Sequence, residues 1–468
     1  MFASMESLEA RMLLSSHLDH EIFYPEGYAH DGVGEAVEIA NLTGLEAEFE
    51  LWARYERGQR DQLLVSGALA GGQRDSIVIT EQGRSDTRLV RTDVPYALVL
   101  RSSEPLAAEF KHDDFGGETS EAFTDRTAER WALTNLTRDD DNRAFVVFYN
   151  PFENEVEVEL ELYDDSGQTF KLKQTVGGQR RGGWNLNDTF FLPRGRFAAL
   201  IDASSPISLA RSEYSIGQKK ASGSLGIQNA GDLAGAILSL EFEKRLAPGG
   251  PSASVADTTI TIFNTSDQAA DVRLTFLSRD DSRTPGSLPE LTVSVDSHER
   301  RNISLRDLGF GEREEVSVMY QSDQAVAVAA FIERAGGIFG LNATTQAAQN
   351  WRFFDGLVDR IQRAELRTED VLLFNPTGRS VDVTVRFHFG DGRIITETKS
   401  LEAFEVDDVD ARLPLLTLPG MATRFMITIE SEAPIVTSLE HWGLAGPDGF
   451  AAPYGVVGTG VPMASLLS

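Results

Sequence analysis

The sequence contains no cysteine among its 468 residues, which excludes disulfide bonds, thiol nucleophiles and cysteine-ligated metal sites. Long apolar runs are also missing, since no window approaches the roughly 18 uncharged apolar residues that a membrane span requires. The first residues do not form a standard secretion signal, because Glu6, Glu9 and Arg11 interrupt any apolar stretch. We therefore expect no membrane span.

Positive charge is scarce in this chain. The 43 Lys and Arg residues face 72 Asp and Glu residues, which leaves a net charge of −29 at pH 7. An acidic surface of this size repels phosphate backbones and anionic lipid headgroups, so we expect no nucleic-acid partner. It attracts divalent cations only loosely, so we expect no cofactor beyond loosely bound calcium.

The motifs of common catalytic sites are missing as well. The seven histidines are scattered and never form HExxH or another close metal-binding spacing. There is no G-x-S-x-G serine motif and no phosphate-cradling GxxxxGK[ST] loop. A catalytic triad assembled from distant residues remains open. We expect a protein that is not an enzyme, with no catalytic residue and no metal site.

What the sequence does contain is one phrase repeated four times. Each copy centres on an asparagine preceded by apolar residues, at Asn41, Asn150, Asn264 and Asn375, with spacings of 109, 114 and 111 residues. In every copy, apolar residues follow the asparagine at positions +6, +8, +10 and +12. This period of two predicts a strand with one buried face. A turn cluster around position +17 then predicts a hairpin.

Counting such segments gives about seven short strands per repeat of about 110 residues. This predicts an all-β fold of four tandem immunoglobulin-like β-sandwich modules, with a jelly-roll-type sandwich as the alternative. The strand order is left open. We expect modules at 20–115, 127–216, 234–336 and 351–468, the last with a C-terminal tail, preceded by an N-terminal segment at 1–19. Linker-like connectors are predicted at 116–126, 217–233 and 335–350, and the modules are expected to form a rod or string.

Two resemblances to bacterial exported proteins rest on short phrases. LEARMLLS at residues 8–15 resembles the LEPR-XLL signature of exported planctomycete-type proteins, although Ala10 replaces the usual proline. Residues 23–44 resemble the opening of repeated surface modules, in which an aromatic-x-Glu-Gly phrase, here Tyr24, Glu26 and Gly27, precedes an asparagine, here Asn41. These resemblances imply export and an architectural or adhesive role without catalysis. Only the first repeat keeps the Glu-Gly phrase.

Candidate ligand-binding residues are few. Trp52 lies on the polar side of its strand alternation, so it is the tryptophan most expected to be exposed and to stack on a glycan. A glutamate also recurs in the last strand of each repeat, at Glu109, Glu213, Glu333 and Glu440. A carboxylate beside an aromatic residue can contact a sugar. The favoured interpretation is that these glutamates mark a solvent face or protect an edge strand from association.

Aspartate pairs form the other candidate group. They lie at 139–141, 164–165, 280–281 and 407–408, and none matches the calcium-binding EF-hand loop. Because aspartate is common in turns for conformational reasons, we interpret them as turn residues rather than calcium ligands.

The sequence thus predicts a non-catalytic, exported or cell-surface structural or adhesive protein. Its expected partner is a polysaccharide or protein of the cell envelope or the extracellular space, and repeated modules would add weak contacts together. A carbohydrate-binding surface protein is the alternative, and a hydrolase with a dispersed site is the third hypothesis.

Overall fold

The computed structural model describes residues 18–468 apart from 57, 85–87, 116, 218–219, 244–256, 279–287, 289, 310–312, 335–336, 360–366, 390–391, 411–421, 444–455, 458–459 and 463–468. The all-β prediction is confirmed. The described residues form strands and two short 3-10 helices, η2 (Leu186–Asp188) and η3 (Leu305–Leu308). The segment at 1–17, with the phrase that resembles LEPR-XLL, lies outside the described residues.

The first group of strands forms two facing antiparallel sheets, in the orders β1-β6-β3-β4 and β5-β2-β7-β8. Its strands are β1 (His20–Tyr24), β2 (Gly34–Asn41), β3 (Ala47–Tyr55), β4 (Gln62–Leu69), β5 (Arg74–Thr80), β6 (Tyr96–Ser102), β7 (Leu106–Asp114) and β8 (Gly117–Ala122). The pairings of second with fifth and third with sixth strand are those of an immunoglobulin sandwich. The first strand, however, pairs with the sixth, and the second also pairs with the seventh.

The second group repeats this order, except that one long strand replaces β6 and β7. Its strands are β9 (Ala128–Arg138), β10 (Asn142–Asn150), β11 (Val156–Asp164), β12 (Thr169–Val176), β13 (Arg180–Asn185), β14 (Gly195–Ser215), β15 (Lys220–Leu225) and β16 (Ile227–Gln228). The first half of β14 pairs with β9 and β11, and its second half pairs with β10 and β15.

The third and fourth groups follow the same scheme with β22 and β29 as the long strands. The third contains β17 (Asp232–Glu243), β18 (Asp257–Asn264), β19 (Ala270–Ser278), β20 (Glu290–Val295), β21 (Arg300–Ser304), β22 (Arg313–Arg334) and β23 (Gly337–Asn342). The fourth contains β24 (Gln346–Asp359), β25 (Arg367–Phe374), β26 (Val381–Phe389), β27 (Ile394–Leu401), β28 (Val406–Asp410), β29 (Ala422–Gly443), β30 (Val456–Val457) and β31 (Gly460–Pro462).

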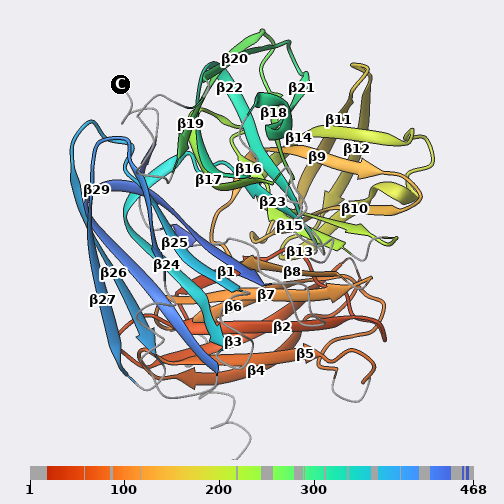
Figure 1. Cartoon of the computed structure of the whole chain (residues 1–468). Helices are drawn as coiled ribbons and strands as arrows, with labels where there is room; N and C mark the ends of the chain where they lie inside the picture. The colour runs from red at the N-terminus through yellow and green to blue at the C-terminus, as the bar shows by residue number, and fades with distance from the viewer. Residues whose placement is uncertain are drawn as a thin grey trace, which may run out of the picture.

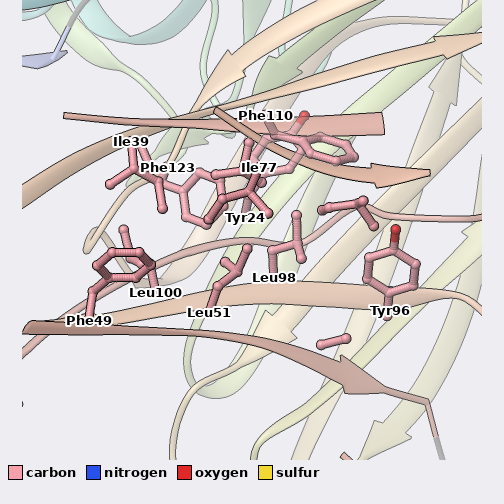
Figure 2. Close-up of a cluster of buried hydrophobic side chains, with 14 of the residues drawn as sticks. Tyr24, Ile39, Phe49, Leu51, Ile77, Tyr96, Leu98, Leu100, Phe110 and Phe123 are labelled. Atoms are coloured by element: carbon pink, nitrogen blue, oxygen red, sulfur yellow. The ribbon is translucent and has the colours of Figure 1, made fainter. Parts of the chain in front are cut away.

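Each group encloses an apolar core between two layers of strands, which the long strand connects in the second to fourth groups. We call the four groups the first to fourth sandwiches and each layer a sheet. The alternating residues after each asparagine supply one wall of each core, as the period of two predicts. In the first sandwich, Phe49, Leu51 and Leu98 face Ile39, Phe110 and Phe123, with Tyr24 between them (Figure 2).

The repeated asparagine fixes the end of each sandwich. All four asparagine side chains are fully buried. In each copy, Nδ2 donates to the backbone carbonyl four residues later, at 2.6–2.7 Å, and to a carbonyl at or just after the end of the fourth strand. Oδ1 accepts from the backbone N–H two residues later. The side chain thus joins the arch between the second and third strands to the turn after the fourth.

The stretches predicted as linkers contain strands instead. β8, β15 and β23 each pair with the strand before them, and they pack beside one another along the chain order. Their glycines serve close packing: a Cβ on Gly223 would lie 3.2 Å from the Glu121 side chain, and one on Gly340 would lie 2.5 Å from that of Arg211. The glycine content therefore reflects close approach between strands rather than chain flexibility.

The four sandwiches do not form a rod. The red-orange, yellow, green and blue strands follow one another around the molecule, and the blue strands return to the orange ones (Figure 1). Small apolar clusters fill each junction between neighbours. They are Phe23, Ala97, Val99 and Tyr149 at the first junction; Ala132, Tyr163, Ala198, Leu200, Ile227, Ala230, Phe263 and Ala327 at the second; Ala234, Ala236, Leu238, Ala347, Leu372, Phe374, Val406 and Val436 at the third; and Ala40, Ala107 and Met426 between the fourth sandwich and the first.

The predicted rod is therefore wrong, and the reason lies on the outer faces of the sheets. In each sandwich, the outer face of the sheet that contains the third strand packs on the next sandwich. There it meets the outer face of the sheet that contains the second strand. Each sandwich therefore contacts one neighbour through each of these two faces, and the chain closes into a ring. A head-to-tail contact whose rotation closes produces such a ring.

Candidate functional site

A buried network of charged groups lies within the first sandwich, next to Tyr214 of the second. Glu35 lies at the centre, where Oε1 is 3.0 Å from His112 Nδ1 and accepts the Tyr28 backbone N–H at 2.8 Å, while Oε2 accepts the Tyr96 hydroxyl. Burial alone would lower the pKa of His112, but the hydrogen bond and charge of Glu35 outweigh it and raise the pKa to about 9. At pH 7, His112 is therefore a cation paired with Glu35.

The Glu-Gly phrase of the first repeat builds the contact with the second sandwich. The buried Glu26 carboxylate accepts the Ser212 hydroxyl at one oxygen and the Tyr214 hydroxyl at the other, the latter at 3.1 Å. A Cβ on Gly27 would overlap the ring of Tyr96, so only glycine lets the backbone pass there. The Glu-Gly phrase therefore helps to hold the first sandwich against the second. The sequence pattern alone did not reveal this role.

Arg211 extends the polar network toward the third sandwich. Its buried guanidinium donates to the Ser224 hydroxyl at 3.0 Å and the Ser222 hydroxyl at 3.2 Å, and it lies 5.0 Å from the ring centroid of Phe331. Burial lowers the pKa of Arg211, and the neighbouring carboxylates oppose that shift. Burial also raises the pKa of Glu121 to about 8, against the charge of Arg211.

A cleft of about 610 Å³ opens beside this arginine, between the second and third sandwiches. Its lining is mostly polar, with carboxylates, amides, hydroxyls and guanidinium groups. Residues of this kind in the lining are Asn135, Thr137, Asp139, Asp141, Asn142, Arg196, Arg211, Glu213, Ser215, Ser222, Asp257, Thr259, Thr261, Asn302 and Glu333. Such a surface offers both hydrogen-bond donors and acceptors to a small polar ligand.

Two of the recurring glutamates, Glu213 and Glu333, line this cleft. Glu213 lies beside Arg211. Its carboxylate lies 3.4 Å from Arg211 Nη1. Burial raises the pKa of Glu213, while Arg211 and Thr137 lower it. Across the cleft, Asp257 stands directly opposite Glu333 in the neighbouring strand, and Arg306 pairs with Asp257 at 2.9 Å. Burial raises the pKa of Asp257 despite that arginine.

Two exposed phenylalanines lie in the loop that leads into Gly195 and Arg196, which line this cleft. Phe190 is 91% exposed and Phe191 46% exposed, with ring centroids 5.6 Å apart. The loop that carries them is held to the 139–142 turn, because Asn187 donates to the Asp139 and Asn142 carbonyls and Arg194 pairs with Asp140. Sequence reasoning missed these residues, although two adjacent phenylalanines, Phe190 and Phe191, were the available signal.

Trp52 does not form an exposed stacking surface. Its side chain is partly buried and packs on the apolar cluster of the first junction. Nε1 donates to Glu50 Oε2 at 2.9 Å, and the Arg54 guanidinium lies 5.2 Å from the ring centroid. The prediction of exposure is wrong because the outward face of β3 meets a neighbouring sandwich rather than water. Trp131 and Trp351 are fully buried in their own cores.

The recurring glutamates do not occupy one repeated position. Measured from the repeated asparagine, their strand partners fall at four different places: Glu38 for Glu109, Ala144 for Glu213, Asp257 for Glu333 and Asp370 for Glu440. Glu109 is fully buried in β7, which runs between β2 and β8. Neither the solvent-face nor the edge-strand interpretation holds for Glu109. The side chain of Glu440 lies outside the described residues.

Aspartates at two of the predicted clusters stabilise turns. Asp139 accepts the backbone N–H groups of Asp141 and Asn142, and Asp164 accepts those of Ser166 and Gln168. These bonds outweigh burial and lower the pKa of both aspartates. The turn interpretation is confirmed at these two and is wrong for Asp407 and Asp408, which lie within β28. Asp280–Asp281 lies outside the described residues. Within the described ranges, no group of three or more His, Asp or Glu residues could hold a metal ion.

Comparison with known proteins gives little help. No protein-family model and no curated protein matches the chain. Among solved structures, Thermotoga maritima 1070 matches with a TM-score of 0.21 and 8% identity over 22% of this chain and 97% of that chain. The tetra-tandem repeat from the extending region of a large adhesion protein matches with a TM-score of 0.12 and 10% identity, covering 89% of this chain and 92% of that one. The native conformation of E. coli alpha-2-macroglobulin matches with a TM-score of 0.14 and 10% identity, covering 94% of this chain and 40% of that one. Scores this low carry no argument about function.

Proposed function

We propose that this chain is a non-catalytic, exported or cell-surface structural or adhesive protein. The observation that carries the proposal is the closed ring, in which the broad faces of the sandwiches are buried against one another. The loops and the cleft between the second and third sandwiches then remain for contact with a partner. The phrase at residues 8–15 supports export, since it resembles a signature of exported bacterial proteins. None of the described helices is long and apolar enough to cross a membrane.

A carbohydrate-binding role is the second candidate, and the polar cleft favours it. Sugars need both donors and acceptors, and the cleft presents Arg196 and Asn302 as donors beside the carboxylates of Glu213 and Glu333. This site replaces Trp52 as the place where a glycan would bind, because Trp52 belongs to a junction.

The test is binding of the purified chain to an array of bacterial and plant polysaccharides, with and without calcium. If the cleft binds sugars, selective binding is expected, and Thr259→Trp, which fills the cleft, should reduce it at least tenfold. Thr398→Trp, an equally bulky change on exposed β27, should leave it unchanged, as should Trp52→Ala. Loss of binding with Trp52→Ala but not with Thr259→Trp would contradict the cleft as the site.

Uniform absence of binding by the folded chain would overturn the carbohydrate candidate and leave the structural role. The non-catalytic part is tested in the same samples by measuring new reducing ends after prolonged incubation. None is expected, and release of sugar would contradict it. Surface location is tested with antibodies against the chain on intact cells of the source bacterium, where labelling is expected and labelling only after lysis would contradict it.

A further inference from the structure

The four junctions use the same positions of the repeat. On one side stands the residue just before the repeated asparagine, which is Ala40, Tyr149, Phe263 or Phe374. On the other side stands a residue of the sixth strand, fixed by its register against the third strand, which is Ala97, Ala198, Ser317 or Met426. Seven of these eight residues belong to the apolar junction clusters, and all eight are buried.

The sizes of these residues are reversed at one junction only. Tyr149 packs with Ala97, and Phe263 packs with Ala198, so an aromatic ring meets a small residue. At the third junction, the corresponding residues are Phe374 and Ser317. Between the fourth sandwich and the first, by contrast, the small Ala40 meets the long side chain of Met426.

This reversal makes the two terminal faces selective for each other. Protein interiors are close-packed, and added volume in a packed contact is destabilising. The Met426 face would collide with an aromatic residue such as Tyr149, whereas the Ala40 face would leave a gap against Ala97. The face with Ala40 and the face with Met426 therefore fit one another better than they fit any internal face.

We propose that these two faces form a dedicated head-to-tail interface, one face on β2 and β7 of the first sandwich and the other on β29 of the fourth. When the two faces of one molecule are not in contact with each other, each binds the opposite face of a second copy of this chain. The contact is heterologous, so the same pair of faces serves within one chain or between chains. Closure within the chain is favoured at low concentration, because the covalent connection gives the two faces a high effective concentration. This inference does not depend on the proposed function.

The partner is a second copy because the interface between the faces is already present in the structure. Ala40, Ala107 and Met426 are each less than a tenth exposed and pack together with Leu42. Separation of the faces would expose two apolar surfaces. Within the part of the chain that the structure describes, the surfaces complementary to them are the same two faces of another molecule.

The test uses two variants, each with one damaged face. Met426→Asp leaves the Ala40 face intact, and Ala40→Asp leaves the Met426 face intact. Each variant alone should remain a monomer near 51.3 kDa with a larger radius of gyration than the wild type, because the damaged contact opens the ring. Mixed in equal amounts, they should form a complex of twice that mass, measured by light scattering.

The controls separate this result from misfolding or nonspecific association. The double variant Ala40→Asp/Met426→Asp has no intact face, so it should stay monomeric when it is mixed with either single variant. Val78→Asp, an exposed change on β5, should behave as the wild type. If Ala40→Asp does not fold, Ala40→Phe replaces it, since its ring is too large for Met426. A mixture that stays monomeric although both variants are folded and open would overturn the proposal, as would single variants that remain as compact as the wild type.

Discussion

Asn150→Ala should lower the free energy of unfolding of the second sandwich by about 3 kcal/mol. The Asn150 side chain donates to the Asn154 carbonyl at 2.7 Å and the Gly177 carbonyl at 3.1 Å, and it accepts the Phe152 N–H at 3.1 Å. Alanine leaves these partly buried backbone groups without a partner, and each such loss costs roughly 1–3 kcal/mol when the group is buried, so about 3 kcal/mol is expected for the three together. Urea unfolding measures the loss, and hydrogen exchange in β10–β12 localises it.

The matched control for this change lies in the same turn. Asn154 is exposed, and its side chain makes no hydrogen bond among those found in the described residues, so Asn154→Ala should change stability by less than about 0.5 kcal/mol. Asn150→Asp should be at least as destabilising as Asn150→Ala, because a carboxylate would face two carbonyl oxygens. Equal stability of Asn150→Ala and Asn154→Ala would show that the repeated asparagine does not hold the arch.

Raising the pH from about 6.5 to 9 should destabilise the wild-type chain through His112. The pKa of His112 is raised from 6.5 to about 9 in the folded chain. A raised pKa stabilises the fold fully below the unfolded value and loses that effect as pH rises through the folded value. The shift corresponds to about 3 kcal/mol. The pKa of Glu121 is raised to about 8 in the folded chain, so its contribution to stability also falls as the pH rises from the unfolded pKa to about 8.

His112→Gln isolates this contribution. The variant should be less stable than the wild type at pH 6.5 and should lose about 3 kcal/mol less between pH 6.5 and 9. His20→Gln, at an exposed position of β1, should keep the wild-type dependence. Melting temperature measured at half-unit pH steps decides the question. If the stability of the wild type and that of His112→Gln fall in parallel across this range, His112 does not stabilise the fold as a cation.

Part of this architecture can be predicted from the sequence, because each of the four repeats places the same residue types at the same positions of its strands and turns. The buried asparagines and the period-2 residues after them reveal the strands and turns, since each repeat must solve the same local problem. The repeated asparagine marks the arch between the second and third strands of each sandwich. Its bonds to the turn after the fourth strand were not foreseen, because those carbonyls lie more than 25 residues away in sequence.

The ring and the site were not predictable in the same way. Apolar residues on the outward side of the strands, such as Tyr149 and Phe263, interrupt the alternation only slightly, so a single sandwich gives little sign that both faces are covered. For the same reason Trp52 was expected to be exposed. The recurring glutamates misled because they recur at similar sequence distances from the asparagine, whereas their positions along the strand that pairs with the second strand differ among the four repeats.

Small-angle X-ray scattering of the full chain tests the closed ring most directly. A compact chain of 468 residues has a radius of gyration of about 23 Å. Four sandwiches end to end, each about 30 Å long from strands of nine residues, would reach about 120 Å and a radius of gyration of about 35 Å. The ring predicts a value close to the first figure with a single compact distance distribution. A value near the second would contradict closure of the fourth sandwich on the first.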